Sequence, residues 1–378
     1  MEKVSITKVS TKQQMDVFAQ FGNKLYEDCP YAVPDLVYDI KDTFNPKKNP
    51  AYDFSDSQLF LAMRGEEVVG RVAAMINRKA NETWNVKNVR FGYLDFIDDS
   101  SVLKALLDAV EKWGTDQGMT GIQGPMGFTD FDKEGMLVEG FDQMGSMTTY
   151  YNYPYYPKRM EELGYVKEAD WVQIRVRVPG ECPEKYSRVA EMVKRRYKLK
   201  VGKLTGNLVF KQKYGQKIFN LLNEAYAPLF GYSALSQRQI DLYVDTYFKL
   251  VDLNLVTYIE DEAGELISIG VTMGSLSEAL RKAKGKLFPM GWYHLLRSLK
   301  VKPEKTVEML LIAVKPEYQG RGINALLFTD LIPIYNRYGF EWAETGPQLE
   351  TNMKELSQWE PLNPTFPKRR RCYTKSIM

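Results

Sequence analysis

The chain has 378 residues, a net charge of +3 and 44% hydrophobic residues, so it can build two domains with substantial cores. The near-neutral charge gives no argument for a nucleic-acid partner, and no apolar run approaches the roughly 20 residues of a membrane span. One histidine, His294, argues against histidine-pair and histidine–metal chemistry. The three cysteines are far apart in the sequence, which predicts reduced thiols and no metal site. The amino terminus lacks the apolar core of a signal peptide, so we expect a cytoplasmic protein.

The first half predicts a run of strands and helices that ends at a turn-rich boundary. In chain order we expect a strand, an amphipathic helix, two hairpin strands, a further strand, a capped helix and another strand, at residues 4–9, 11–26, 59–64, 67–76, 89–97, 102–116 and 121–126. A loop rich in glycine and carboxylates follows, then a helix at 156–163 and a strand at 171–178. The sequence Pro179-Gly180-Glu181-Cys182-Pro183 is typical of a linker, which predicts domains at 1–180 and 181–378.

The second half repeats this order of elements. It predicts helices at 183–197, 214–226, 237–250, 323–332 and 352–359, and strands at 198–204, 255–260, 265–274, 307–314, 340–345 and 369–375. An insertion that is both basic and apolar occupies residues 277–305. The repeated order predicts an α/β chain of two tandem domains with the same fold.

One stretch of the second half has the pattern of a phosphate site. The apolar strand ends at Lys315-Pro316, the turn Gln319-Gly320-Arg321-Gly322 follows, and a helix begins at Ile323-Asn324. A strand, a glycine turn and a helix start direct successive backbone N–H groups, and the positive end of the helix dipole, toward one point.

These residues resemble the acyl-CoA signature of the GNAT superfamily of N-acyltransferases. The family's Gln/Arg-x-x-Gly-x-Gly/Ala loop, often preceded by Val-x-Pro-Glu-Tyr, stands here as Val314-Lys-Pro-Glu-Tyr318 followed by residues 319–324. The resemblance implies two mostly antiparallel mixed sheets flanked by helices, and acyl-CoA as co-substrate. It also implies CoA contacts from the strand end, the loop and the start of a later helix: Ala313, Val314, Gln319, Gly320, Arg321, Gly322, Ile323, Asn324 and Asn352.

Two positions depart from the family pattern. Asn324 stands where relatives prefer glycine or alanine, although asparagine is small enough to begin a helix. Trp359 stands where relatives often carry a tyrosine that protonates the leaving thiolate. Because tryptophan has no acid to offer, the proton must come from Tyr373 or from water.

Glu308 is the predicted general base. It lies eleven positions before Gln319, where one branch of the family places its catalytic glutamate, although a solvated glutamate at a strand entrance fits equally well. The first half has Asp98-Asp99 where the glycine loop would be. Carboxylates there would repel a pyrophosphate, so we expect one CoA site, in the second domain.

The acceptor amine is predicted to bind the carboxylate loop of the first half. Asp130, Asp132 and Glu134 could pair with a cationic amine, and the alternative is a plain acidic surface loop. The insertion is a candidate peripheral membrane contact through residues 281–305, a lid over an acyl chain, or an ordinary solvated helix.

The sequence therefore predicts an N-acyltransferase, in the first instance an N-acetyltransferase, acting on a small-molecule or lipid amine. Two alternatives remain at this point: a long-chain acyl-CoA N-acyltransferase that acts on a lipid amine at a membrane, and a non-catalytic acyl-CoA sensor. A tandem aminoacyl transferase that uses transfer RNA is disfavoured by the phosphate loop and the low net charge.

Overall fold

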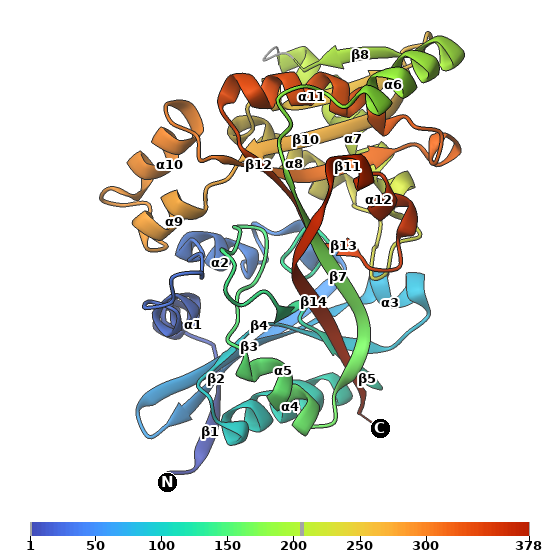
Figure 1. Ribbon diagram of the computed structural model, residues 1–378. Helices are drawn as coiled ribbons and strands as arrows, with labels where there is room; N and C mark the ends of the chain where they lie inside the picture. The colour runs from blue at the N-terminus through green and yellow to red at the C-terminus, as the bar shows by residue number, and fades with distance from the viewer. Residues whose placement is uncertain (1, 205–207, 378) are drawn as a thin grey trace. The chain divides into compact units, whose positions relative to one another are not determined.

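The computed structural model describes residues 2–204 and 208–377, which form two compact units (Figure 1). Unit 1 comprises Met1–Trp171, Ser277–Leu295 and Lys368–Met378, and unit 2 comprises Val172–Leu276 and Leu296–Pro367. The sequence predicted a single cut after residue 180. The compact units divide the chain differently, because Ser277–Leu295 and Lys368–Met378 belong to unit 1 and the rest of the second half to unit 2.

Unit 1 is a mixed sheet with helices on both faces. Its strands run in the order β1-β2-β3-β4-β5-β14, and only β4 and β5 are parallel. Its elements are β1 Val4–Lys8, α1 Lys12–Leu25, α2 Val37–Thr43, β2 Ser55–Arg64, β3 Glu67–Asn77, α3 Arg78–Trp84, β4 Asn88–Phe96, α4 Ser100–Thr115, β5 Gly121–Gly124, β6 Met136–Glu139 and α5 Tyr155–Glu162. Helix α4 packs in one core and helices α1 and α2 in another, so both faces of the sheet are covered.

Two strands and the insertion each contribute residues to both units. Strands β7, Val166–Arg177, and β14, Thr365–Ser376, each begin in one unit and end in the other. Helix α9, Ser277–Ala283, belongs to unit 1, and α10, Gly291–Lys300, begins there.

Unit 2 repeats the architecture. Its strands run in the order β7-β12-β11-β10-β9-β8, and only β11 and β12 are parallel. Its elements are α6 Glu184–Tyr197, β8 Lys200–Lys203, α7 Leu208–Tyr226, α8 Gln237–Leu250, β9 Val256–Glu260, β10 Leu266–Gly274, β11 Thr306–Val314, α11 Asn324–Tyr338, β12 Trp342–Thr345, β13 Gln348–Leu349 and α12 Met353–Ser357. Helices α6 and α11 share one core with the sheet.

The two units place equivalent elements in the same order. In each, a hairpin leads to a strand (β4 or β11), a helix (α4 or α11) crosses over, and a parallel strand (β5 or β12) follows. The predicted α/β class and tandem repeat are therefore confirmed. The sequence did not indicate α2 and α3, which are seven residues long and too short for a clear helical period.

Candidate functional site

The glycine loop of unit 2 leaves a group of backbone donors open. Gly320 and Gly322 have φ values of +73° and +81°, which turn the chain sharply before α11 begins. Helix α11 has Ile323 as its N-cap, with no side-chain cap. Within the described residues, the N–H groups of Gly320, Gly322 and Ile323 have no backbone acceptor. Uncapped donors at the start of a fifteen-residue helix are the arrangement that binds a phosphate.

Only glycine fits position 322, because a side chain would clash with a neighbour and would disfavour the positive φ. A Cβ atom at this position would lie 2.6 Å from Cγ1 of Val189, which belongs to α6. Helix α6 therefore closes one side of the loop. Arg321 lies over the rings of Tyr197 and Tyr318, at 5.7 and 5.9 Å from their centroids, so its cation is held beside the turn.

Strand β11, which leads into the glycine loop, contains a bulge. The pairing with β10 shifts between Val271 and Thr272, which leaves Leu310 as an extra residue in β11. The shift reverses the alternation of faces, so Met309 and Ile312 both face the core shared with α11.

Beyond the bulge, β11 and β12 separate. Their pairing ends at Met309 and Thr345, while β11 continues to Val314. Because Lys315 N–H donates to Ile267, alternation along the ladder turns the polar groups of Ile312 and Val314 away from β10. Side chains from outside the ladder reach both carbonyl oxygens: Tyr226 at Ile312, 2.9 Å, and Gln319 at Val314, 3.1 Å. The N–H groups of the same two residues point into the gap that β12 has left.

Helix α12 brings a titratable carboxyl group to this region. Asn352 is its N-cap and accepts a 3.4 Å hydrogen bond from the N–H of Glu355. Burial raises the pKa of Glu355 to about 7. Hydrogen bonds with Trp359 and Gln358 act in the opposite direction, because they favour the charged form, but burial outweighs them. Burial, and then the charge of Glu355, raise the pKa of Tyr226, so these two groups are neighbours.

Gln358 ties α12 to the glycine loop. The Asn324 amide donates to Oε1 of Gln358, and the Tyr186 hydroxyl donates to its backbone oxygen at 2.7 Å. Trp359 is buried and packs edge-on against Phe328 of α11, at 5.1 Å between ring centroids. The family's usual tyrosine position is thus occupied by a packing residue.

Glu308 lies near the start of β11 and is buried in the sheet. It is 7% exposed and aligns with Met273 on β10 and Glu344 on β12. The predicted base is therefore a buried residue of β11, not a solvated one. Its catalytic role stays a prediction.

Tyr373 lies in the other unit. It pairs with Gly124 in the sheet of unit 1, is fully buried in that core, and donates a 3.3 Å hydrogen bond to Glu161. Its hydroxyl is thus engaged by a carboxylate of unit 1, and its role as proton donor stays a prediction.

The three predicted acceptor carboxylates come together in unit 1. Burial raises the pKa values of Asp130, to about 7, and of Asp132, and it raises that of Glu134 together with the neighbouring charge of Asp130. Each side chain remains partly exposed to solvent. Arg90, which the sequence did not indicate, is buried beside them, favours their charged forms and donates to the oxygen of Gly127 at 3.2 Å.

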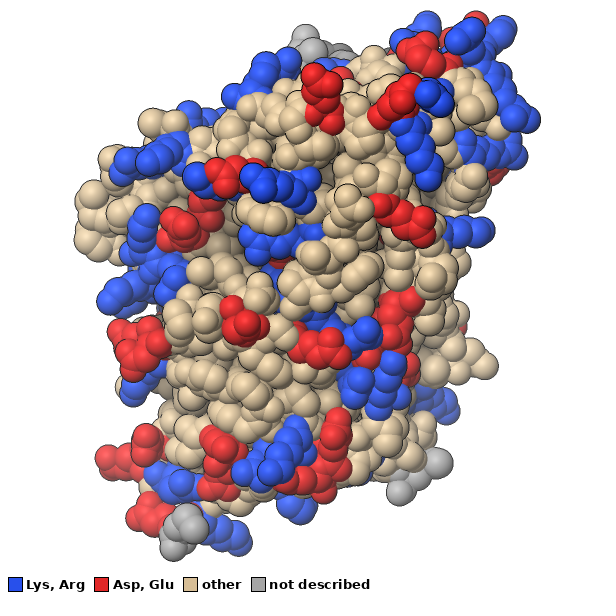
Figure 2. Space-filling view, in the orientation of Figure 1, with Lys and Arg blue, Asp and Glu red and all other residues tan. Residues whose placement is uncertain are grey.

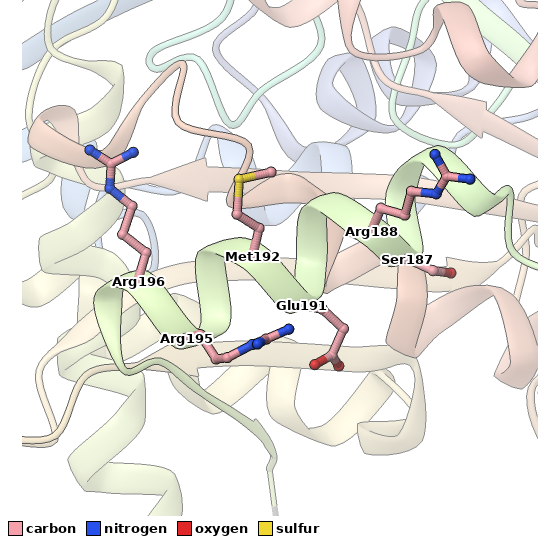
Figure 3. A pocket seen from close by; sticks show the side chains of 6 residues that line it. All are labelled: Ser187, Arg188, Glu191, Met192, Arg195 and Arg196. Atoms are coloured by element: carbon pink, nitrogen blue, oxygen red, sulfur yellow. The ribbon is translucent and has the colours of Figure 1, made fainter.

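A surface hollow along α6 adds positive charge to unit 2. Figure 3 shows Arg188, Met192 and Arg196, spaced four residues apart, projecting from the same side of the helix. Ser187, Glu191 and Arg195 complete its lining. The sequence marked α6 only as a leading helix, because nothing local indicates that it packs on the loop.

Comparison with known proteins agrees with this architecture. No family model matches the sequence. A bacterial ceramide synthase from Caulobacter vibrioides is 28% identical over 391 residues, covering 99% of this chain and 98% of that protein. Protein YghO from Escherichia coli is 28% identical over 377 residues, covering 97% and 94%.

Solved structures match along the full length at low identity. A tandem GNAT protein from the clavulanic acid biosynthesis pathway gives a TM-score of 0.58 at 12% identity, covering 100% of this chain and 99% of that one. A GCN5-related N-acetyltransferase from Sphaerobacter thermophilus gives 0.53 at 11% identity, covering 99% and 96%. The chain therefore has the tandem GNAT fold.

Proposed function

We propose that this chain is an N-acyltransferase that transfers a long acyl group from acyl-CoA to the primary amine of a long-chain amino lipid. The observation that carries the proposal is the set of open N–H donors of Gly320, Gly322 and Ile323 beside the gap between β11 and β12. The GNAT fold and the ceramide synthase relative support an acyltransferase.

The substrate class rests on the full-length relation to the ceramide synthase. A ceramide is the amide of a fatty acid and a long-chain amino alcohol. The alignment spans both units, so it covers the donor cradle and the carboxylate group of Asp130, Asp132 and Glu134 alike. It favours a long acyl donor and a lipid acceptor over acetyl transfer to a small amine.

The residues present fit acyl-CoA. The loop N–H groups and the uncapped end of α11 would hold the pyrophosphate, and the arginines of α6 would lie near the remaining phosphate. The N–H groups of Ile312 and Val314 would hold the pantetheine amides and the thioester carbonyl in the gap. Donors fixed there in advance would stabilise the negative charge that develops on the carbonyl oxygen.

Two carboxylates could accept the proton of the amine. The amine nitrogen forms the new C–N bond while the C–S bond breaks, and one proton passes overall from the amine to the thiolate. Glu308 was the predicted base. Glu355 is the second candidate, since a carboxylate whose pKa is about 7 takes up and releases a proton efficiently near neutral pH.

The test is an acyl-transfer assay with paired donors and acceptors. The purified chain is incubated with palmitoyl-CoA or acetyl-CoA, and with sphinganine or spermidine; free thiol and amide product are measured. We expect the palmitoyl-CoA and sphinganine pair to be preferred by about a hundredfold or more. Preference for acetyl-CoA with spermidine would make the chain an acetyltransferase instead. CoA binding without thiol release from any pair would make it a sensor.

A further inference from the structure

The segment between β10 and β11 differs from its counterpart in unit 1. There, β3 and β4 are joined around the short helix α3; here residues 277–305 form α9, α10 and the loop between them. The segment contains eight lysines and arginines and two glutamates, a net charge of +6. The whole chain has a net charge of only +3, so the remainder is net negative.

The loop between α9 and α10 exposes large apolar side chains. Phe288 is 78% exposed, the highest value among the large apolar side chains of the described residues, and Met290 is 53% exposed. Trp292 and Tyr293, in the first turn of α10, are 46% and 41% exposed. A contiguous group of this kind on a water-facing surface is typical of an interaction site.

Hydrogen bonds hold this loop in place. Trp292 N–H donates to Leu287 at 2.8 Å, its indole Nε1 donates to Pro289 at 3.0 Å, and Tyr293 N–H donates to Met290 at 3.1 Å. The side chains are thus presented by an ordered loop and not by a frayed end.

The loop is also fixed to the body of unit 1. The oxygen of Gly285 accepts a 3.1 Å hydrogen bond from Val37, and the Ser277 hydroxyl donates to Gly145 at 2.9 Å. Gly285 is buried, and a Cβ there would overlap the Asn23 amide. The apolar side chains therefore project from a supported base.

Basic side chains flank the apolar group in the sequence. Lys282, Lys284 and Lys286 are exposed on its amino-terminal side, and Arg297 and Lys300 are exposed further along α10. At the edge where Figure 1 places α9 and α10, Figure 2 shows Lys and Arg side chains next to uncharged surface. Apolar side chains beside exposed cations are what the interface of an anionic bilayer binds.

We propose that the loop 284–293 docks this protein on the surface of an anionic phospholipid bilayer. Phe288, Met290 and Trp292 enter the headgroup region, and the flanking lysines contact lipid phosphates. A second copy of the chain fits less well, because self-association would bring two segments of net charge +6 together. A bilayer supplies apolar burial and negative charge at once.

Membrane docking would deepen the proposed function, since long-chain amines and acyl donors partition into bilayers. In that respect the inference rests on the proposed function. The docking itself is measured without any turnover, so failure of one is distinguishable from failure of the other.

The test is co-sedimentation with vesicles. We expect the chain to bind vesicles of phosphatidylcholine that contain about 30% phosphatidylglycerol, at least tenfold more tightly than phosphatidylcholine alone, and to lose this preference at high salt. The double variant Phe288→Ser/Met290→Ser should bind at least tenfold more weakly. Its matched control is Val166→Ser/Phe366→Ser, which removes two exposed apolar side chains elsewhere and should bind like the parent.

A second pair of variants tests the charge. Lys282→Glu/Lys286→Glu should lower binding to anionic vesicles at least tenfold, whereas Lys12→Glu/Lys158→Glu, an equal charge change on exposed lysines of α1 and α5, should lower it much less. Circular dichroism and thermal unfolding show whether each variant is folded.

Three results would overturn the proposal. The first is no binding to anionic vesicles at low salt. The second is equal loss in the apolar variant and its control. The third is a dimer in solution that Phe288→Ser/Met290→Ser dissociates without any vesicle binding by the parent, which would assign the surface to a second copy.

Discussion

Helices α4 and α11 occupy equivalent places in the two units, yet their amino-terminal ends differ. In α4 the N-cap is Asp99, whose carboxylate accepts hydrogen bonds from the N–H and hydroxyl of Ser101 at 2.8 and 2.6 Å. These bonds, with an ion pair to Arg64, lower the pKa of Asp99 to about 2. In α11 the N-cap is Ile323, and two glycines with positive φ precede it.

The difference shows how one fold can keep or fill an anion site. The end of α4 already has a negative charge from its own chain, which accepts from the N–H of Ser101 and interacts favourably with the helix dipole. The end of α11 leaves donors open, as the proposed phosphate site requires. That the first unit binds no CoA stays a prediction. Its physical basis is the Asp99 carboxylate, which occupies the start of α4.

The largest effect is expected from filling the cradle. Gly322→Leu should lower CoA affinity by at least about a hundredfold, because leucine disfavours φ of +81° and its Cβ would overlap Val189. Isothermal titration calorimetry measures the effect. Gly339→Ala is the matched control, since Gly339 has a similar φ of +75° at the other end of α11, with open space around it. Unchanged CoA affinity in Gly322→Leu would disprove the phosphate site.

The next effect separates the two candidate bases. If Glu355 accepts the amine proton, Glu355→Gln should lower kcat by about 10²-fold or more, while CoA affinity is retained. The parent's kcat/KM should rise with pH toward about 7 and then level off, because Glu355 must lose its proton; the variant should lack this limb. Glu308→Gln is measured in parallel. Loss of kcat in Glu308→Gln with an intact limb in Glu355→Gln would assign the base to Glu308.

A smaller effect is expected when α11 is made to resemble α4. Asn324→Asp places a carboxylate at the start of α11, where it should repel the pyrophosphate and lower CoA affinity by about tenfold. The reciprocal change, Asp99→Asn in unit 1, should leave CoA affinity unchanged. If both variants bind CoA like the parent, the cap comparison does not explain which unit binds.

The smallest effect concerns stability in unit 1. Asp99→Ala should lower the free energy of unfolding by about 1 kcal/mol at pH 7, because the cap and the ion pair are lost. The pKa of Asp99 is lowered on folding, so its contribution is present above about pH 4 and is lost as the pH falls toward 2. Urea unfolding of both proteins at pH 7 and near pH 2 measures this, and an equal difference at both values would contradict it.

Local sequence determined most of the elements and indicated the glycine loop proposed as a phosphate cradle. A strand, a glycine turn and a helix start are neighbours in the chain, so residues 314–324 could be recognised without knowing what packs around them. The carboxylates of 130–134 could also be identified as a group, because they lie within one short loop.

Only the tertiary structure decided the contacts between distant segments. Val189 of α6 packs against Gly322, and Tyr226 of α7 donates a hydrogen bond to Ile312. Arg90 of β4 lies beside the carboxylates of residues 130–134. Nothing near these residues in the sequence indicates any of these contacts. The pKa of Glu355 depends on burial, which a sequence does not display. Strand pairing across the chain likewise placed Tyr373 in the core of unit 1, because the hydrogen bonds of a sheet edge are satisfied by whichever strand the fold brings there.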